Sequence, residues 1–141
     1  MKRRAIAVWN GTGKDGSGSL STQSNALNKS VFSFNSRFAG ETGTNPEELL
    51  AAAHTGCFIM KLGFALDEAG FANKTLETTG TITLGATGIT ESHLVVKAWI
   101  AGIGPDVFQA CVRDAELNCP VSMVLRAKIT VEASLMERDP A

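Results

Sequence analysis

Cysteine is scarce in this sequence, and the number and spacing of the three cysteines exclude two classes of protein. Cys57, Cys111 and Cys119 form an odd set, and no two of them have the close spacing of a CxxC motif or a zinc ribbon. A secreted scaffold held by disulfides is shorter and far richer in cysteine. We therefore expect a reducing, cytoplasmic compartment, in which any disulfide serves catalysis or redox sensing.

A surplus of charge of either sign is also missing. The formal net charge is -1, from 13 basic and 14 acidic residues. Nucleic-acid-binding faces and membrane-surface helices need clustered positive charge, so we expect neither nucleic acid nor a membrane as a partner. The apolar run at 5–9, behind a basic start, is too short for an export signal. The 44% hydrophobic content over 141 residues is enough for one packed domain, residues 1–141.

The pattern of apolar residues and breakers predicts an α+β fold, with antiparallel sheets around a long central buried helix. The expected strands, read from short alternating runs bounded by turn residues, are 5–9, 20–24, 30–34, 74–84, 90–101 and 128–135. The expected helices are 46–69, 105–117 and 120–125. We expect the first three strands to form an antiparallel meander with a turn at 25–29.

The clearest boundary is the start of the long helix. The sequence NPEE at 45–48 supplies an N-cap, a proline for the first turn, and two acids, the second of which stands where a capping box needs one. The segment that follows is apolar on nearly every side, and its run at 49–66 reaches the length of a membrane span. His54 and Lys61 within it, and strands on both sides, favour a buried core helix instead.

The long helix does not by itself favour a reactive cysteine. Cys57 lies in the middle of the helix, where burial raises the pKa of a thiol and the helix ends are out of reach. A reactive Cys57 therefore needs a cation, for which His54 and Arg37 are the candidates. Cys119, directly before Pro120 at a helix start, has a backbone setting that favours a thiolate.

Spacing alone leaves the pairing of the cysteines open, because Cys57 could pair with Cys111 or with Cys119. Cys111 lies on the apolar face of the second helix, where a free cysteine is more often inert packing. The same residues would permit a cysteine hydrolase that uses Cys57 and His54, a redox sensor or binding protein of the same fold without turnover, or a purely structural fold. For His54 we favour a satisfied core or interface histidine over a base beside Cys57.

Five segments together resemble the osmotically inducible protein C (OsmC) family, and they span essentially the whole chain. They are AVWNG at 7–11, RF at 37–38, GTNPEELLAAAH at 43–54, CF at 57–58 and NCPVS at 118–122. An arginine a few residues before the GTNPEE stretch, here Arg37, is similar to the OsmC branch. The related organic hydroperoxide resistance branch has its arginine earlier, in a region where this chain offers Lys14.

The resemblance implies an intertwined homodimer with two active sites at its interface, acting as a thiol peroxidase on organic and, more weakly, inorganic hydroperoxides. Cys57 would be the peroxidatic cysteine and Cys119 the resolving cysteine, with Arg37 and Glu47 as the polar pair that activates the site. The family uses no metal and no bound organic cofactor. Its reductant is a dithiol, with a lipoylated protein favoured over thioredoxin. Cys57 would pass through a sulfenic acid to a disulfide with Cys119.

Helix geometry adds an expectation about Glu47. It stands ten positions before Cys57, which is about 15 Å along a straight helix at 1.5 Å per residue. That distance is too long for a shared hydrogen-bond network within one chain. We therefore expect Glu47 to act at the Cys57 site of the other subunit, or only to place favourable charge in the first helical turn. The candidate walls for an alkyl tail, or else ordinary core residues, are Phe58, Ile59, Met60 and Phe64.

Overall fold

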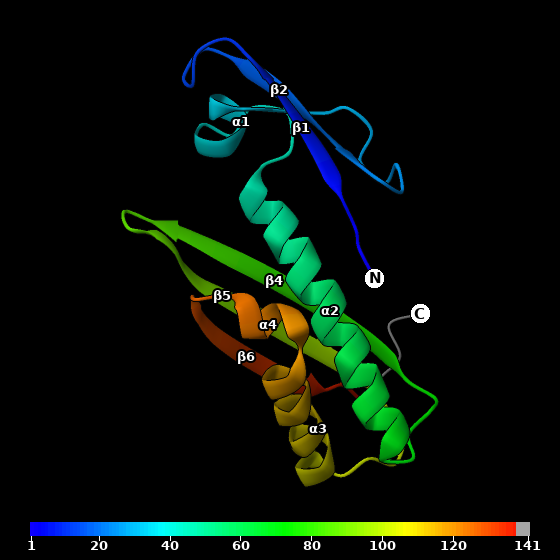
Figure 1. Cartoon of the computed structure of the whole chain (residues 1–141). Coiled ribbons are helices and arrows are strands. Elements are labelled where there is room, and N and C mark those ends of the chain that lie inside the picture. Colours follow the sequence, from blue (N-terminus) through cyan, green and yellow to red (C-terminus); the bar gives the residue numbers. More distant parts are fainter. Residues whose placement is uncertain (138–141) are drawn as a thin grey trace. The chain divides into compact units, whose positions relative to one another are not determined.

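The computed structural model describes residues 1–137 of the chain, in which two three-stranded sheets alternate with helices (Figure 1). The strands are β1 (Ala5–Asn10), β2 (Ser17–Thr22), β3 (Ser30–Ser33), β4 (Thr75–Gly85), β5 (Gly88–Trp99) and β6 (Lys128–Leu135). The helices are α1 (Phe34–Phe38), α2 (Pro46–Glu68), α3 (Pro105–Asn118) and α4 (Pro120–Val124). The predicted α+β class is confirmed.

The backbone contacts group the chain into two compact units, which we describe one at a time. The first unit is Met1–Leu49, and the second begins at Leu50. The prediction of one domain for the whole chain stays a prediction. Each predicted strand and helix is present within a few residues of its expected bounds, and β6 has the bounds predicted for it.

In the first unit, β1, β2 and β3 form the antiparallel meander that the sequence predicts. The ring centres of Trp9 in β1 and Phe32 in β3 lie 5.3 Å apart. Asn25 and Lys29 adopt positive φ angles of 62° and 50°, as a tight turn between β2 and β3 requires. The helix α1 was not predicted, because its cap is unusual: Ser33 and Ser36 form a capping box in which serine replaces the common acid.

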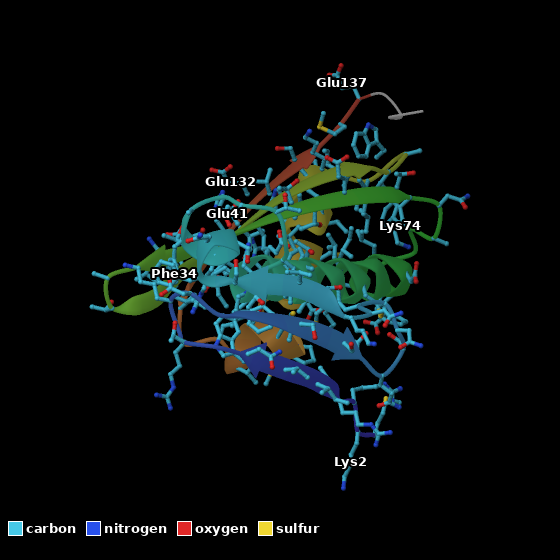
Figure 2. The ribbon with its side chains drawn as sticks, turned by 90° about the horizontal axis from the view of Figure 1, so that it is seen from above. Lys2, Phe34, Glu41, Lys74, Glu132 and Glu137 are labelled. Atoms are coloured by element: carbon cyan, nitrogen blue, oxygen red, sulfur yellow. The ribbon has the colours of Figure 1, made fainter. Side chains whose placement is uncertain are left out.

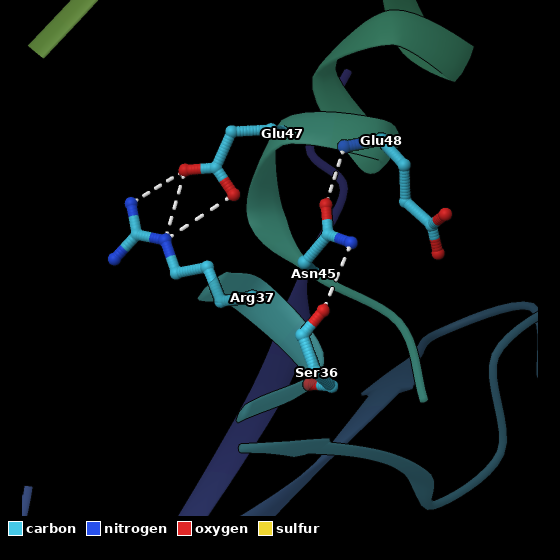
Figure 3. Close-up of polar contacts among 5 residues, drawn as sticks. All are labelled: Ser36, Arg37, Asn45, Glu47 and Glu48. Atoms are coloured by element: carbon cyan, nitrogen blue, oxygen red, sulfur yellow. Dashed lines mark hydrogen bonds and ion pairs between the residues drawn. The ribbon is translucent and has the colours of Figure 1, made fainter. Parts of the chain in front are cut away.

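The start of α2 follows the predicted cap with one difference. The Asn45 side-chain oxygen accepts a hydrogen bond of 2.8 Å from the Glu48 backbone N–H, so Asn45 is the N-cap (Figure 3). The Glu48 carboxylate does not return a bond to Asn45. It accepts instead from the Thr44 hydroxyl at 2.6 Å. The first turn of α2 is therefore anchored to the loop before it by two side chains.

In the second unit, the sheet has the strand order β4–β5–β6. The β4–β5 pair is antiparallel, as predicted, but β6 runs parallel to β5. The prediction of antiparallel sheets is therefore wrong for this one pair. The reason lies in the connection, because α3 and α4 stand between β5 and β6 and supply the long helical crossover that parallel neighbours need.

The core of the second unit lies between this sheet and the helices α2 and α3, which cover one of its faces (Figure 1). Along β5, every second residue from Ser92 to Ala98 is buried, as expected for a strand with one covered face. The fully or nearly fully buried apolar side chains are Phe58, Leu62, Leu66, Leu94, Val96, Ala98, Phe108, Cys111, Val112, Ala115 and Cys119.

The helix α2 is central, but it is not buried on all sides as the sequence suggested. Its buried residues recur every fourth position from His54 to Leu66, so they form one stripe. On other faces Met60 and Phe64 are 65% and 59% exposed. By length and composition α2 is a helix that could cross a membrane, with a mean hydropathy of 1.6 in its most apolar window. Its packing on the sheet is that of a core helix with an additional uncovered apolar face.

Two glycines position α2 against the sheet of the second unit. A Cβ atom on Gly80 of β4 would lie 2.6 Å from the Thr55 methyl group, so only glycine allows the helix this close. At the other end, Gly70 adopts a φ of +94°, and the N–H of Phe71 bonds to the Leu66 carbonyl, which ends the helix. Lys74, labelled in Figure 2, then pairs with the Asp67 carboxylate.

The hydroxyl of Thr78 in β4 is buried and has no hydrogen-bond partner among residues 1–137. Replacing it with a methyl group should remove the desolvation cost of that hydroxyl, so we expect Thr78→Val to raise the free energy of unfolding by about 1 kcal/mol. Urea unfolding at fixed protein concentration measures this. Thr79→Val is the matched control, because Thr79 is exposed on the same strand. Equal effects of the two changes would contradict the prediction.

Candidate functional site

Two of the three cysteines meet in the second unit. The sulfur atoms of Cys57 in α2 and Cys119 at the start of α4 lie 3.1 Å apart, and both residues are free thiols. Cys119 is fully buried, whereas Cys57 is partly exposed. Cys111 is buried elsewhere in the core, with its sulfur 3.7 Å from the Ala65 carbonyl oxygen. The structure thus brings Cys57 and Cys119 together and places Cys111 apart from them, and a redox pair of Cys57 with Cys119 stays a prediction.

The pKa values of the two thiols are shifted in opposite directions. Burial raises the pKa of Cys57, a backbone hydrogen bond from Val121 lowers it, and the neighbouring Cys119 raises it again, so that the net shift is upward. Burial also raises the pKa of Cys119, but the Ser122 backbone N–H, the hydrogen bond between the two sulfurs and the Ser122 hydroxyl together outweigh it. The net pKa of Cys119 is lowered. This is the direction that the position of Cys119 at a helix start suggested.

His54 occupies the core, where no part of it is exposed. Its Nδ1 lies 2.6 Å from the Ser92 hydroxyl oxygen, and its Nε2 lies 2.7 Å from that of Ser122. Burial lowers the pKa of His54, so the imidazole is neutral at neutral pH. The preferred interpretation as a satisfied core histidine is confirmed. Because both ring nitrogens bind serines, His54 offers Cys57 neither a base nor a cation, and this contradicts the cysteine hydrolase alternative.

In the first unit, Arg37 of α1 and Glu47 of α2 form a forked ion pair (Figure 3). The Arg37 Nε donates to both carboxylate oxygens at 2.9 and 3.2 Å, and Nη2 donates to one of them at 2.5 Å. These hydrogen bonds lower the pKa of Glu47 and raise the pKa of Arg37. The two residues that the family resemblance joined as a polar pair are thus in direct contact.

The guanidinium of Arg37 keeps part of its donor capacity. Within residues 1–137, Nη1 takes no part in the bonds to Glu47, and the group lies 5.0 Å from the centre of the Phe38 ring. A small cavity of about 120 Å³ opens beside it. Half of the residues that line the cavity are aromatic, namely Trp9, Phe32, Phe34 and Phe38, and the others are Gly13, Ser33, Arg37 and Pro46. An arginine with a free donor at an apolar cavity can hold a polar head group whose tail is apolar.

This aromatic cavity was missed by the sequence analysis, which placed the apolar walls on α2. Phe58 has no exposed surface and is a core residue, so it cannot line a binding site within the chain. Ile59 is partly buried, and Met60 and Phe64 are exposed. The available signal was the clustering of phenylalanines around Arg37 in the sequence at 32–38.

The described residues, 1–137, contain no group of three or more histidine, cysteine and acidic side chains that could hold a metal ion. The histidine nearest to the cysteine pair in the sequence, His54, uses both ring nitrogens for serine hydroxyls. What the cysteine pair offers is two sulfur atoms within contact distance, one of them partly exposed. Such a pair can pass between a dithiol and a disulfide.

Comparisons with known proteins agree with this architecture. The structure resembles the organic hydroperoxide resistance protein OhrB of Bacillus subtilis, with a TM-score of 0.63 and 23% identity over 94% of this chain and 98% of that one. It also resembles an OsmC-like protein of unknown function from Vibrio cholerae, with a TM-score of 0.70 and 14% identity over 95% and 99% of the two chains. At these identities the likeness shows the fold alone.

The sequence comparisons show the family. The chain is 41% identical over 139 residues to the peroxiredoxin OsmC of Escherichia coli, which covers 96% of this chain and 97% of that protein, and equally to the peroxiredoxin OsmC of Shigella flexneri. The family model described as OsmC-like protein matches residues 39–134, a range that contains both Cys57 and Cys119. This chain therefore belongs to the OsmC-like protein family.

Proposed function

We propose that this protein is a thiol peroxidase that reduces organic hydroperoxides to alcohols, with Cys57 as the attacking cysteine and Cys119 as the resolving cysteine. The observation that carries the proposal is the 3.1 Å between the two sulfur atoms, with the partly exposed one on Cys57. The relatives' names, peroxiredoxin OsmC and organic hydroperoxide resistance protein, support a peroxidase.

The proposed reaction has three balanced steps. The Cys57 thiolate attacks the terminal peroxide oxygen, the O–O bond breaks, and the departing alkoxide takes a proton to become an alcohol. Cys57 is left as a sulfenic acid. Cys119 then attacks the Cys57 sulfur, and hydroxide leaves with the Cys119 proton as water, which forms the disulfide. A dithiol finally reduces the disulfide and is itself oxidised to a disulfide.

The activation of Cys57 needs more than the second unit provides, since burial raises the pKa of this thiol. We assign the missing positive charge to Arg37, which Glu47 holds by a forked hydrogen-bonded ion pair. An arginine held in this way stays charged and keeps a donor for a peroxide oxygen. The aromatic cavity beside it suits the apolar group of an organic hydroperoxide better than hydrogen peroxide.

We further propose that the protein acts as a homodimer in the cytoplasm. Several large apolar side chains of the second unit are strongly exposed in the single chain, and covering them would stabilise an association by about 25 cal/mol for each Å² of apolar surface. They are Met60, Phe64, Leu117, Met123 and Val124. The dithiol reductant is proposed to be a lipoylated protein.

A redox sensor with the same cysteine pair is the alternative function, and turnover distinguishes the two. We expect cumene hydroperoxide to be consumed catalytically in the presence of a dithiol, and Cys57→Ser to reduce the rate to the uncatalysed one, because the nucleophile is lost. Cys119→Ser should stop turnover by the disulfide route while Cys57 is still oxidised. Cys111→Ser is the matched control and should keep the activity. One oxidation equivalent without turnover would support the sensor and contradict the peroxidase.

The pairing of the sulfurs predicts which disulfide forms. After one equivalent of peroxide, we expect mass mapping to find Cys57 joined to Cys119, since these sulfurs are already in contact. Cys111 should remain a thiol that is alkylated only after unfolding, because it is buried. A disulfide that contains Cys111 would contradict the mechanism.

The distance along α2 predicts that Glu47 serves the Cys57 of the other subunit. Glu47→Ala and Cys57→Ser homodimers should both be strongly impaired. A purified mixed dimer with one change in each chain would then regain one intact site, and about half of the wild-type activity, because a two-fold dimer has two equivalent sites. The control dimer carries both changes in one chain and none in the other, which leaves no intact site if Glu47 acts across the interface. An inactive mixed dimer would contradict this prediction.

A further inference from the structure

His54 is a buried side chain of α2 to which the proposed peroxide chemistry gives no task. Its Nδ1 lies 2.6 Å from the Ser92 hydroxyl oxygen of β5, and its Nε2 lies 2.7 Å from the Ser122 hydroxyl oxygen of α4. Ser92, His54 and Ser122 are exposed by only 1%, 0% and 8%. Burying three polar side chains costs free energy unless each of them is paired. One imidazole ring therefore joins α2 to the sheet on one side and to the short helix α4 on the other.

The hydrogen bond from His54 to α4 runs beside the cysteine pair. His54 stands three positions before Cys57 in α2, and Ser122 stands three positions after Cys119, which is the N-cap of α4. The same two segments are thus joined at two points with equal spacing. One point is the hydrogen bond between His54 and Ser122, and the other is the 3.1 Å contact between the sulfur atoms of Cys57 and Cys119.

The helix α4 needs such an anchor because it is short and largely exposed. It has five residues, and a helix of that length is not stable by itself. Ser122 is its buried residue, and Val121 packs in part against the core. Met123 and Val124 are 71% and 75% exposed. The position of α4 against α2 therefore depends strongly on the bond that Ser122 makes to His54.

We propose that His54 is a positioning residue that holds α4 against α2 through Ser122, and so keeps the Cys119 sulfur in reach of the Cys57 sulfur when their disulfide forms. The bond to Ser92 fixes the opposite side of the ring, so that Nε2 faces Ser122. The role in turnover rests on the proposed peroxidase function, whereas the placing of the two thiols does not.

The position of α4 acts on the resolving step. In that step the Cys119 sulfur attacks the sulfenic sulfur of Cys57, the S–O bond breaks, and hydroxide leaves with the Cys119 proton as water. A helix that is free to leave α2 lowers the effective concentration of the Cys119 thiol at Cys57. The finished disulfide holds α4 in place, because its bond geometry is narrow. Loss of the hydrogen bond to His54 therefore also destabilises the disulfide relative to the two thiols.

Two substitutions of His54 separate its two hydrogen bonds. The side-chain amide of glutamine reaches the position of Nε2 and can keep the bond to Ser122, whereas that of asparagine reaches only the position of Nδ1 and can keep the bond to Ser92. All chains carry Cys111→Ser, so that two thiols remain. Mixtures of reduced and oxidised glutathione then set the equilibrium, in which one glutathione disulfide becomes two thiols as the Cys57–Cys119 disulfide forms.

We expect His54→Asn to lower the equilibrium constant for this disulfide about fivefold, which is the equivalent of one typical net hydrogen bond. His54→Gln should leave the constant close to that of the parent. Mass measurement after alkylation gives the fraction of disulfide at each glutathione ratio. Each variant loses one buried hydrogen bond, so urea unfolding of the reduced chains should show similar losses of stability. Equal disulfide constants in the two variants would overturn the proposal.

Ser122→Ala and Ser92→Ala repeat the contrast from the partners' side, and they decide the matter if His54→Asn does not fold. Ser122→Ala should lower the disulfide constant, and Ser92→Ala should lower it less. Thr55→Val is the matched control in α2, because the Thr55 hydroxyl bonds to the carbonyl oxygens of Ala51 and Ala52. The control should leave the constant unchanged, and a fall equal to that in Ser122→Ala would contradict the proposed role.

Cumene hydroperoxide tests the role in turnover. We expect His54→Asn to slow the conversion of the Cys57 sulfenic acid to the disulfide about fivefold, so that dimedone traps more of it, while the oxidation of Cys57 keeps its rate. Equal slowing of both steps would indicate a merely structural contribution and overturn that role. A disulfide constant that falls in His54→Asn, in a protein whose wild type turns over no peroxide, would retain the positioning and overturn the peroxidase function instead.

Discussion

The packing of one stripe of α2 against β5 is the interaction on which the second unit depends. Phe58, Leu62 and Leu66 have no exposed surface, and burial of each such side chain stabilises the fold by about 1.5–3 kcal/mol. The stripe sets the rotation of the helix about its axis. Cys57 precedes Phe58 by one residue, so it lies at the edge of the stripe, partly exposed and in contact with Cys119.

The pKa values of the two cysteines are shifted in opposite directions, and their surroundings in this packing explain why. A thiol at the edge of an apolar core, far from either helix end, gains little that favours a negative charge, and the pKa of Cys57 is raised. Cys119 is more deeply buried, yet its pKa is lowered, because hydrogen bonds from Ser122 and Val121 outweigh the burial. The sulfur with the raised pKa is partly exposed, and the sulfur with the lowered pKa is buried.

The first unit contains a charged pair and a cavity, and the second unit contains the cysteine pair. The forked pair of Arg37 and Glu47 is a charge-assisted contact between α1 and the start of α2, with an aromatic cavity at its side. Neither feature explains chemistry alone. The ion pair and the cavity both lie within the first unit, and the cysteine with the raised pKa lies in the second.

The amino-acid pattern was enough to predict the order and type of nearly all elements, because periodicity, caps and turn residues act locally. It also identified Cys57, Cys119, Arg37 and Glu47 through a family resemblance, and the inert surroundings of Cys111 through its helix face. Only the tertiary structure decided that Cys57 faces Cys119, that β6 runs parallel to β5, and that His54 binds two serines from β5 and α4. These are contacts between residues 37 to 68 positions apart, which no local pattern encodes.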